Sequence, residues 1–164
     1  MPEALDPVPL LKHLHEHGIE HIIIGGFAVV AHGHVRTSKD LDIVPDPAPE
    51  NLQRLARLLV EIEAQHVGLE DFSPEEFPFD PTDPLQLAEG ANFRLDTSLG
   101  PIDIMQWVAG IETDPAYTEL DRGAIESSVD GVRVRVCSLE HLRAMKRAAG
   151  RPQDLEDLKR LGEE

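Results

Sequence analysis

The feature that most constrains the fold of this chain is a β-branched run that ends at two glycines and is followed by an Asp-Leu-Asp segment. Residues 19–24 predict a buried strand, and Gly25-Gly26 predicts a turn into a short apolar helix. Asp40 and Asp42 alternate with apolar residues, which predicts a second strand with both carboxylates on one face. The sequence therefore predicts a strand, a glycine turn and a carboxylate pair within one short stretch of chain.

Apolar spacing and turn residues predict the other elements. We expect helices at 5–17, 49–66, 117–125, 138–149 and 152–161, and strands at 93–97, 102–106 and 132–136. The Pro-rich, acidic residues 68–90 predict a surface loop over or beside a cleft. This order predicts an α/β (α+β) fold with helices packed on a mixed sheet. The length of 164 residues fits one domain, 1–164.

Asp40 and Asp42 carry the first chemical signal. Two neighbouring carboxylates repel each other unless a cation compensates their charge, and hard oxygen ligands at this spacing suit Mg²⁺. The backbone N–H groups of Gly25 and Gly26, between a strand and a helix, can meet a phosphate. A phosphate cradle so close to a carboxylate pair favours phosphoryl or nucleotidyl transfer.

A third carboxylate is expected from a neighbouring strand. Asp103 has the right context because Ile102 and Ile104 enclose it, and a buried acid is costly unless it is paired or bound to a metal. In two-metal enzymes such an acid can bind a cation and take the proton of the attacking hydroxyl. Asp96 is a rival that we rank second, because a polar residue at a strand end needs no function.

These residues resemble the DNA polymerase β-type nucleotidyltransferase superfamily and, within it, the minimal bacterial group related to AbiEii-type toxins. The superfamily pattern of a glycine turn, an Asp-x-Asp strand and a later lone Asp is matched by Gly25-Gly26, Asp40-Leu41-Asp42 and Asp103. The AbiEii-like group is also similar in its His-Gly-x-x-Arg-Thr linker, here residues 32–37. A C-terminal Leu-x-x-Met-Lys run that continues to Arg-x-x-Asp-Leu-x-Asp-Leu corresponds to residues 142–158.

The resemblance implies a polymerase β-like nucleotidyltransferase fold and a role for each matching residue. Gly25 and Gly26 would hold the triphosphate of an NTP. The three aspartates would bind Mg²⁺ or Mn²⁺, with Asp103 as the general base. Further candidates for contact with the nucleotide are Arg36, Thr37, Lys146 and Arg151. One departure is Gly26, which stands where many members have Ser, so that a hydroxyl contact to phosphate is missing at that position.

The C-terminal part of the chain is basic, whereas the rest of the chain is acidic. Residues 133–160 hold eight Lys and Arg against four Asp and Glu, and we expect this whole segment, with a basic helical pair at about 138–161, to face the same cleft and receive the triphosphate. Asp154 and Asp157 are expected to orient Lys146 or Arg151 through exposed ion pairs. The last helix is expected to bury one apolar stripe, formed by Leu155, Leu158 and Leu161.

Charge and cysteine content exclude other classes of protein. The formal net charge of −16 argues against general duplex DNA binding, because phosphate contacts need Lys and Arg. Cys137 is the single cysteine, so an internal disulfide is excluded and a reducing compartment is indicated. No apolar run reaches the roughly 18 residues of a membrane-spanning helix. With no visible signal peptide, we expect a cytoplasmic protein.

Three functional hypotheses follow. The first is an Mg²⁺-dependent nucleotidyltransferase that moves an NMP from an NTP to a hydroxyl of a protein or RNA, within a toxin–antitoxin or phage-defence system. The second is an inactive nucleotide-binding or antitoxin-like module that acts by forming a complex with a protein, such as one encoded by a neighbouring gene. The third is a sensor that binds NTP without turnover. Neither the nucleotide nor the acceptor is specified by the sequence.

Overall fold

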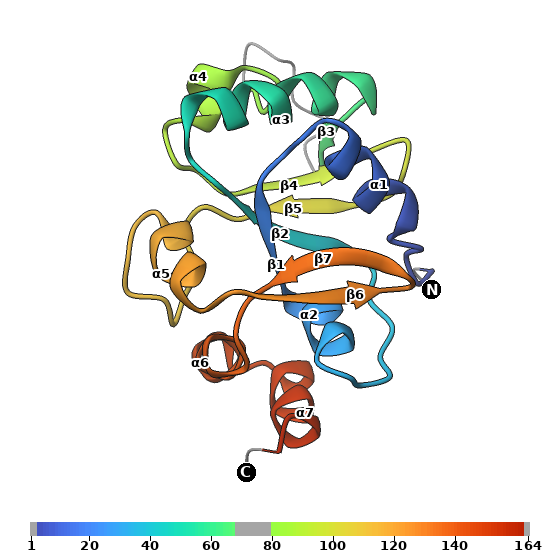
Figure 1. Ribbon diagram of the computed structural model, residues 1–164, viewed down its shortest axis with the longest axis vertical. Coiled ribbons are helices and arrows are strands. Elements are labelled where there is room, and N and C mark those ends of the chain that lie inside the picture. The colour runs from blue at the N-terminus through green and yellow to red at the C-terminus, as the bar shows by residue number, and fades with distance from the viewer. Residues whose placement is uncertain (1–2, 68–79, 163–164) are drawn as a thin grey trace.

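The computed structural model describes residues 3–67 and 80–162, which form a seven-stranded mixed sheet with helices packed on it (Figure 1). The strands are β1 (His21–Ile24), β2 (Leu41–Pro45), β3 (Gln65–His66), β4 (Phe93–Asp96), β5 (Ile102–Ile104), β6 (Ile125–Val129) and β7 (Val132–Val136). Their order across the sheet is β3-β4-β5-β2-β1-β7-β6. The pairs β2–β5 and β1–β7 are parallel, and the other neighbours are antiparallel. The predicted α/β fold with a mixed sheet is confirmed.

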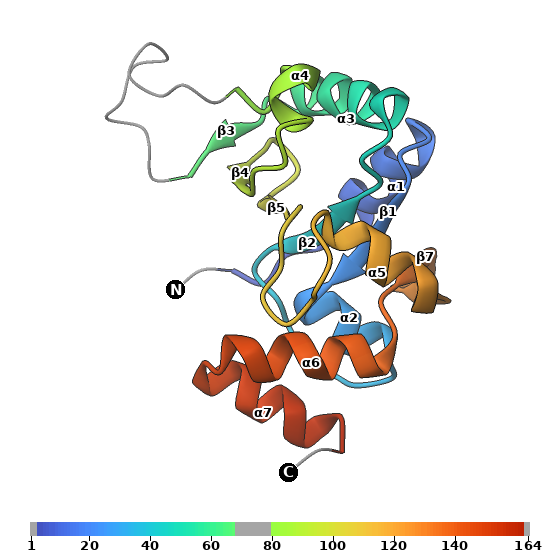
Figure 2. The same cartoon turned by 90° about the vertical axis from the view of Figure 1, so that its left-hand side faces the viewer.

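The helices gather at the two ends and along the faces of this sheet. They are α1 (Val8–Glu16), α2 (Gly25–Ala31), α3 (Pro49–Glu61), α4 (Pro84–Leu87), α5 (Ala116–Gly123), α6 (Leu139–Ala149) and α7 (Pro152–Arg160). Helices α3 and α4 lie at one end of the molecule, and the pair α6–α7 lies at the other (Figure 2). Helix α2 packs on β1 and β2 and contacts α6. None of the described helices is both long and apolar enough to cross a bilayer.

The predicted strand–turn–helix unit lies at the centre of the sheet. The side chains of Ile22 and Ile23 in β1 are fully buried, as are those of Leu41 and Ile43 in β2. Burial of a side chain of this size contributes about 1.5–3 kcal/mol each. The register pairs Ile24 with Asp42, so the glycine turn that follows Ile24 begins beside the carboxylate-bearing end of β2.

Two predicted helices end earlier than the apolar pattern indicates. Helix α3 stops at Glu61 because Glu63 adopts a φ of 56°, which turns the chain away from the helix axis. The prediction of helix to residue 66 was therefore wrong, since residues 65–66 form β3 on the edge of the sheet. Helix α5 ends at Gly123, and Ile125 begins β6, a mostly exposed edge strand that we did not predict.

The Pro-rich loop is described only in part. Residues 68–79 lie outside the described residues, so the prediction of a loop beside a cleft is not tested for them. Within residues 80–90 the chain forms the short helix α4, capped by the side chain of Asp83 through a hydrogen bond from the N–H of Leu85. Leu87 of α4 is fully buried, so this part of the stretch belongs to the core.

The C-terminal helices begin and end as predicted, but α7 buries a different face. Ser138 caps α6 by accepting a hydrogen bond of 3.0 Å from the N–H of His141, and Gly150 ends it with a φ of 62°. In α7, Leu158 is buried but Leu155 is 51% exposed. The predicted leucine stripe is therefore wrong in part, because two aspartates occupy the buried face of α7 and contact a buried lysine of α6.

Candidate active site

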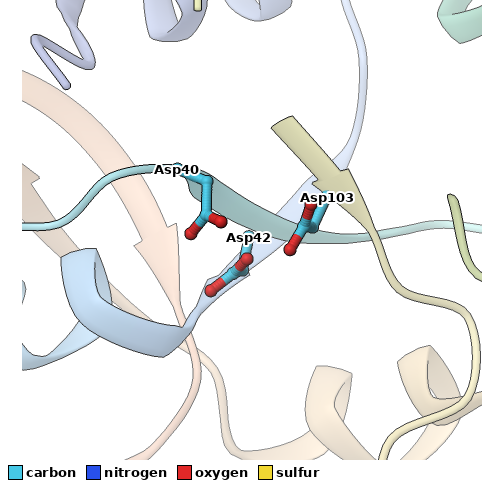
Figure 3. Close-up of side chains that lie close together, drawn as sticks. All are labelled: Asp40, Asp42 and Asp103. Carbon is cyan, nitrogen blue, oxygen red and sulfur yellow. The ribbon is translucent and has the colours of Figure 1, made fainter. Parts of the chain in front are cut away.

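The candidate site is built on adjacent strands at the centre of the sheet. The parallel register of β2 and β5 places Asp42 opposite Asp103, and Asp40 stands immediately before β2. One carboxylate oxygen of each aspartate lies within 4.8 Å of the others, and the three side chains converge (Figure 3). We call this group the acidic triad. The structure thus brings together the three predicted aspartates, and Asp96, the rival, is not part of the group.

Burial and mutual repulsion perturb the acidic triad. Burial raises the pKa of Asp42 well above its usual range, and the negative charges of Asp40 and Asp103 raise it further. Burial and the charge of Asp40 also raise the pKa of Asp103, whereas Arg94 acts in the opposite direction. Both carboxyl groups therefore resist ionisation until a cation compensates them.

Gly25 is required by a close approach of backbone to carboxylate. Its φ is 72°, a left-handed conformation that favours glycine. A Cβ atom at this position would collide with Oδ2 of Asp42. The glycine turn therefore lies directly against the acidic triad, and the carboxylate of Asp42 occupies the space that a side chain would fill.

At Gly26 two other side chains fill the space that a side chain would need. A Cβ atom here would collide with Nη1 of Arg36 and would lie 2.8 Å from Oγ of Ser38. The Ser38 hydroxyl donates a hydrogen bond of 2.9 Å to the backbone carbonyl of Asp40. The sequence indicated only that a hydroxyl is missing at Gly26. The structure places the hydroxyl of Ser38 beside the turn. Ser38 could not be found from the sequence, because no local pattern relates it to Gly26.

A buried ion cluster joins α6 and α7 to the segment before β2. The Nζ atom of Lys146 lies 2.8 Å from Oδ2 of Asp157 and 3.3 Å from Oδ1 of Asp154. Asp157 also accepts a hydrogen bond of 2.9 Å from Nε of Arg36, and Asp154 accepts one of 2.7 Å from Nε of Arg151. Lys146 is 6% exposed, Asp154 1% and Asp157 0%. The expectation of exposed ion pairs was therefore wrong for Lys146, whose pairs with Asp154 and Asp157 are buried. The side chain of Arg151, in contrast, is exposed.

The charges of this cluster act on one another and on the acidic triad. Burial alone would raise the pKa of Asp154, but its bonds to Arg151 and the charge of Lys146 hold it below the usual range. The pKa of Asp157 is likewise lowered, against the effect of burial, by Lys146 and Arg36. The positive charge of Lys146 also acts on Asp42, where it opposes the rise in pKa that burial and the other two aspartates cause.

The other predicted nucleotide-binding residues are Arg151 and Thr37. The hydrogen bond to Asp154 and the charge of that carboxylate raise the pKa of Arg151, and the charges of Asp42 and Asp40 act in the same direction. Thr37 is exposed, and its backbone carbonyl accepts a hydrogen bond from Arg36.

The basic segment 133–160 is not one surface facing the site. Arg133 lies 2.6 Å from Glu126 on the neighbouring edge strand, and Arg135 pairs with Asp121 and with the hydroxyl of Tyr117. These arginines are engaged within β6, β7 and α5. The expectation that the whole segment faces one cleft was therefore wrong for Arg133 and Arg135.

The residues of the acidic triad fit a divalent cation. Carboxylate oxygens are the ligands that Mg²⁺ and Mn²⁺ prefer. Within the part of the chain that the structure describes, Oδ1 of Asp103 is buried and accepts no hydrogen bond, although a buried carboxylate oxygen normally has a partner. A ligand position is therefore available on a side chain whose ionisation a cation would favour.

Comparison with known proteins shows a similar fold. No protein-family model and no curated protein matches the chain. A similar solved structure is that of a protein from Thermotoga maritima, described as a candidate nucleotidyltransferase, with a TM-score of 0.55 and 17% sequence identity. The match covers 94% of this chain and 92% of that one. The AbiEii-like grouping stays a prediction, and the chain has a nucleotidyltransferase-like fold.

Proposed function

We propose that this protein is a nucleotidyltransferase that uses Mg²⁺ or Mn²⁺ to transfer an NMP from an NTP to a hydroxyl group. The observation that carries the proposal is the convergence of Asp40, Asp42 and Asp103 within a nucleotidyltransferase-like fold. Carboxylates that are this close repel one another when ionised, and a divalent cation that compensates them would also compensate the charge of a triphosphate.

In the proposed reaction the acceptor oxygen forms a bond to the α-phosphorus, and the bond between the α- and β-phosphates breaks. Pyrophosphate leaves, and the hydroxyl proton passes to Asp103. Asp40, Asp42 and Asp103 hold the divalent cation, which when bound neutralises charge on the phosphates. The N–H groups of Gly25 and Gly26 and the charges of Lys146 and Arg151 orient the triphosphate. Catalysis then rests on positioning and charge compensation.

The proposal also covers the acceptor and the biological setting. The acceptor is a hydroxyl of a protein or RNA, and the biological setting is a toxin–antitoxin or phage-defence system. The net charge of −16 disfavours a long polyanionic acceptor, which supports a protein or a short RNA end.

The test is transfer of label from each of the four α-labelled NTPs to macromolecules of a cell extract, with Mg²⁺ or Mn²⁺ present. Asp42→Asn removes a residue of the acidic triad, and Asp96→Asn is a matched control on the exposed face of β4. We expect transfer by the wild type and by Asp96→Asn, and loss of transfer in Asp42→Asn. Equal transfer by wild type and Asp42→Asn, or no transfer with any nucleotide, contradicts the proposal.

A second candidate is a nucleotide-binding or antitoxin-like module that acts by complex formation. The observation that favours it is the full engagement of Lys146 by two buried carboxylates, which leaves this cation compensated before any phosphate binds. A rise in melting temperature with NTP and metal but no label transfer would favour binding without turnover. Co-purification of a partner protein, with no such rise, would favour complex formation.

A further inference from the structure

The acidic triad has a cationic neighbour that the sequence does not single out. The antiparallel register of β4 and β5 places Arg94 directly opposite Asp103, and the parallel register of β5 and β2 places Asp103 opposite Asp42. Side chains at paired positions of neighbouring strands lie on the same face of a sheet. Arg94, Asp103 and Asp42 therefore form one row across the sheet.

The contact between Arg94 and Asp103 is close but loose. Nε of Arg94 lies 3.6 Å from Oδ1 of Asp103, beyond hydrogen-bond distance, and this is the carboxylate oxygen that accepts no hydrogen bond. The side chain of Arg94 is 66% exposed, so its guanidinium can leave without breaking core packing. Such a contact compensates charge without fixing the arginine in place.

Arg94 and a divalent cation would both compensate the carboxylate of Asp103. A cation held by the three aspartates takes Asp103 as a ligand, and it would then carry two positive charges beside the guanidinium. The two cations repel each other, so the position of one opposes the binding of the other. If Arg94 served only to stabilise the sheet, its removal would not change the affinity for a divalent cation.

We propose that Arg94 is the resting counter-ion of the acidic triad, occupying Oδ1 of Asp103 until a divalent cation displaces it. This inference rests on the proposed function only in requiring that the triad binds a divalent cation. Arg94 is a positioning residue in this account, because it acts through Asp103.

The test is titration with Mn²⁺ alone at pH 8, with the site defined as the binding that Asp42→Asn abolishes. Arg94→Gln is the main variant, and Arg133→Gln is the control, since it removes the same charge from an exposed ion pair at the other edge of the sheet. Arg94→Lys keeps the charge and serves as a second variant. The melting temperature of each metal-free protein is measured alongside.

Removal of Arg94 is expected to tighten Mn²⁺ binding about three- to tenfold and to lower the melting temperature of the metal-free protein. Arg94→Lys and Arg133→Gln are expected to bind Mn²⁺ within about twofold of the wild type. In an Asp103→Asn background, Arg94→Gln is expected to give no further tightening, because residue 103 no longer carries the charge that Arg94 compensates.

The outcomes separate this inference from the proposed function. Unchanged or weaker Mn²⁺ binding in Arg94→Gln, or equal tightening in Arg133→Gln or Arg94→Lys, overturns the role of Arg94 and leaves the metal site standing. A wild-type protein with no Mn²⁺ site that depends on Asp42 overturns the inference and the metal-dependent function together.

Discussion

The carboxylate of Asp42 occupies the space that a side chain at Gly25 would need. A Cβ atom on Gly25 would collide with Oδ2 of Asp42, and the backbone of Gly25 holds a φ of 72°. The turn and the acidic triad, which are separate motifs in the sequence, are therefore one structural unit. A side chain added at Gly25 must therefore displace the carboxylate of Asp42.

Gly25→Ala is expected to destabilise the protein by about 1–2 kcal/mol through the left-handed backbone alone and to weaken Mn²⁺ binding through displacement of Asp42. Gly131→Ala is the matched control, because Gly131 has a φ of 82° and no atom within 4 Å of its Cβ position. Urea unfolding measures the strain that both variants share. Titration with Mn²⁺ should show weaker binding in Gly25→Ala and unchanged binding in Gly131→Ala. Intact Mn²⁺ binding in Gly25→Ala would contradict the claim that a side chain at Gly25 displaces Asp42.

Gly26→Ser introduces the serine that is common in the superfamily whose motifs the sequence resembles. It is expected to destabilise this protein by about 1–3 kcal/mol, because the serine side chain would overpack against Arg36 and Ser38. In the double variant with Arg36→Ala the two effects should not add, and a coupling of at least about 0.5 kcal/mol is expected. Thermal or urea unfolding of the two single variants and the double variant measures this coupling. Additive effects would show that Arg36 does not fill the space at Gly26.

The ion cluster predicts a pH dependence of stability. Ion pairs hold the pKa values of Asp154 and Asp157 below the usual range, so the unfolded chain takes up these two protons at higher pH than the folded chain does. Their contribution to stability is thus fully present above the ordinary carboxyl pKa and is lost as pH falls below it.

Asp157→Asn is expected to cost about 3–5 kcal/mol at pH 7, because it leaves buried Lys146 with less compensation. The difference in unfolding free energy between wild type and variant should shrink from pH 7 to pH 3. Glu126→Gln breaks an exposed ion pair and should stay within about 1 kcal/mol of the wild type. A difference that is constant over this pH range would contradict the lowered pKa of Asp157.

The acidic triad predicts the opposite pH dependence. Burial raises the pKa values of Asp42 and Asp103, so the metal-free protein loses stability from this site as pH rises above the ordinary carboxyl range. Because protons and Mn²⁺ compete for the same oxygens, the rise in melting temperature with Mn²⁺ should be larger at pH 8 than at pH 5. A rise that is equal at both pH values, or that survives in Asp42→Asn, would place the bound metal elsewhere.

Sequence patterns were sufficient for the triad because its residues have local signatures. Asp40 and Asp42 alternate with apolar residues, and Asp103 stands between two isoleucines. The mixed sheet could be predicted for the same reason, since its central strands are β-branched. In contrast, β6 was missed because an exposed edge strand carries no apolar alternation.

The contacts that shape the site could not be predicted, because they depend on strand order and register. The turn residues 98–101 do predict that β4 and β5 form a hairpin, and the structure confirms this pairing, but no sequence pattern indicates the register that places Arg94 opposite Asp103. Asp154 and Asp157 look like solvated charges on a helix, and only the packing of α7 on α6 shows that they are buried around Lys146.

The most direct test of the account is the position of a bound metal. Crystals grown with Mn²⁺ and a non-hydrolysable NTP analogue would give an anomalous difference map that locates the ion. The account predicts a peak within coordination distance of Asp40, Asp42 and Asp103, with the analogue's phosphates completing the shell and Arg94 moved away from Asp103. A map with bound analogue but no peak among these three carboxylates would contradict it.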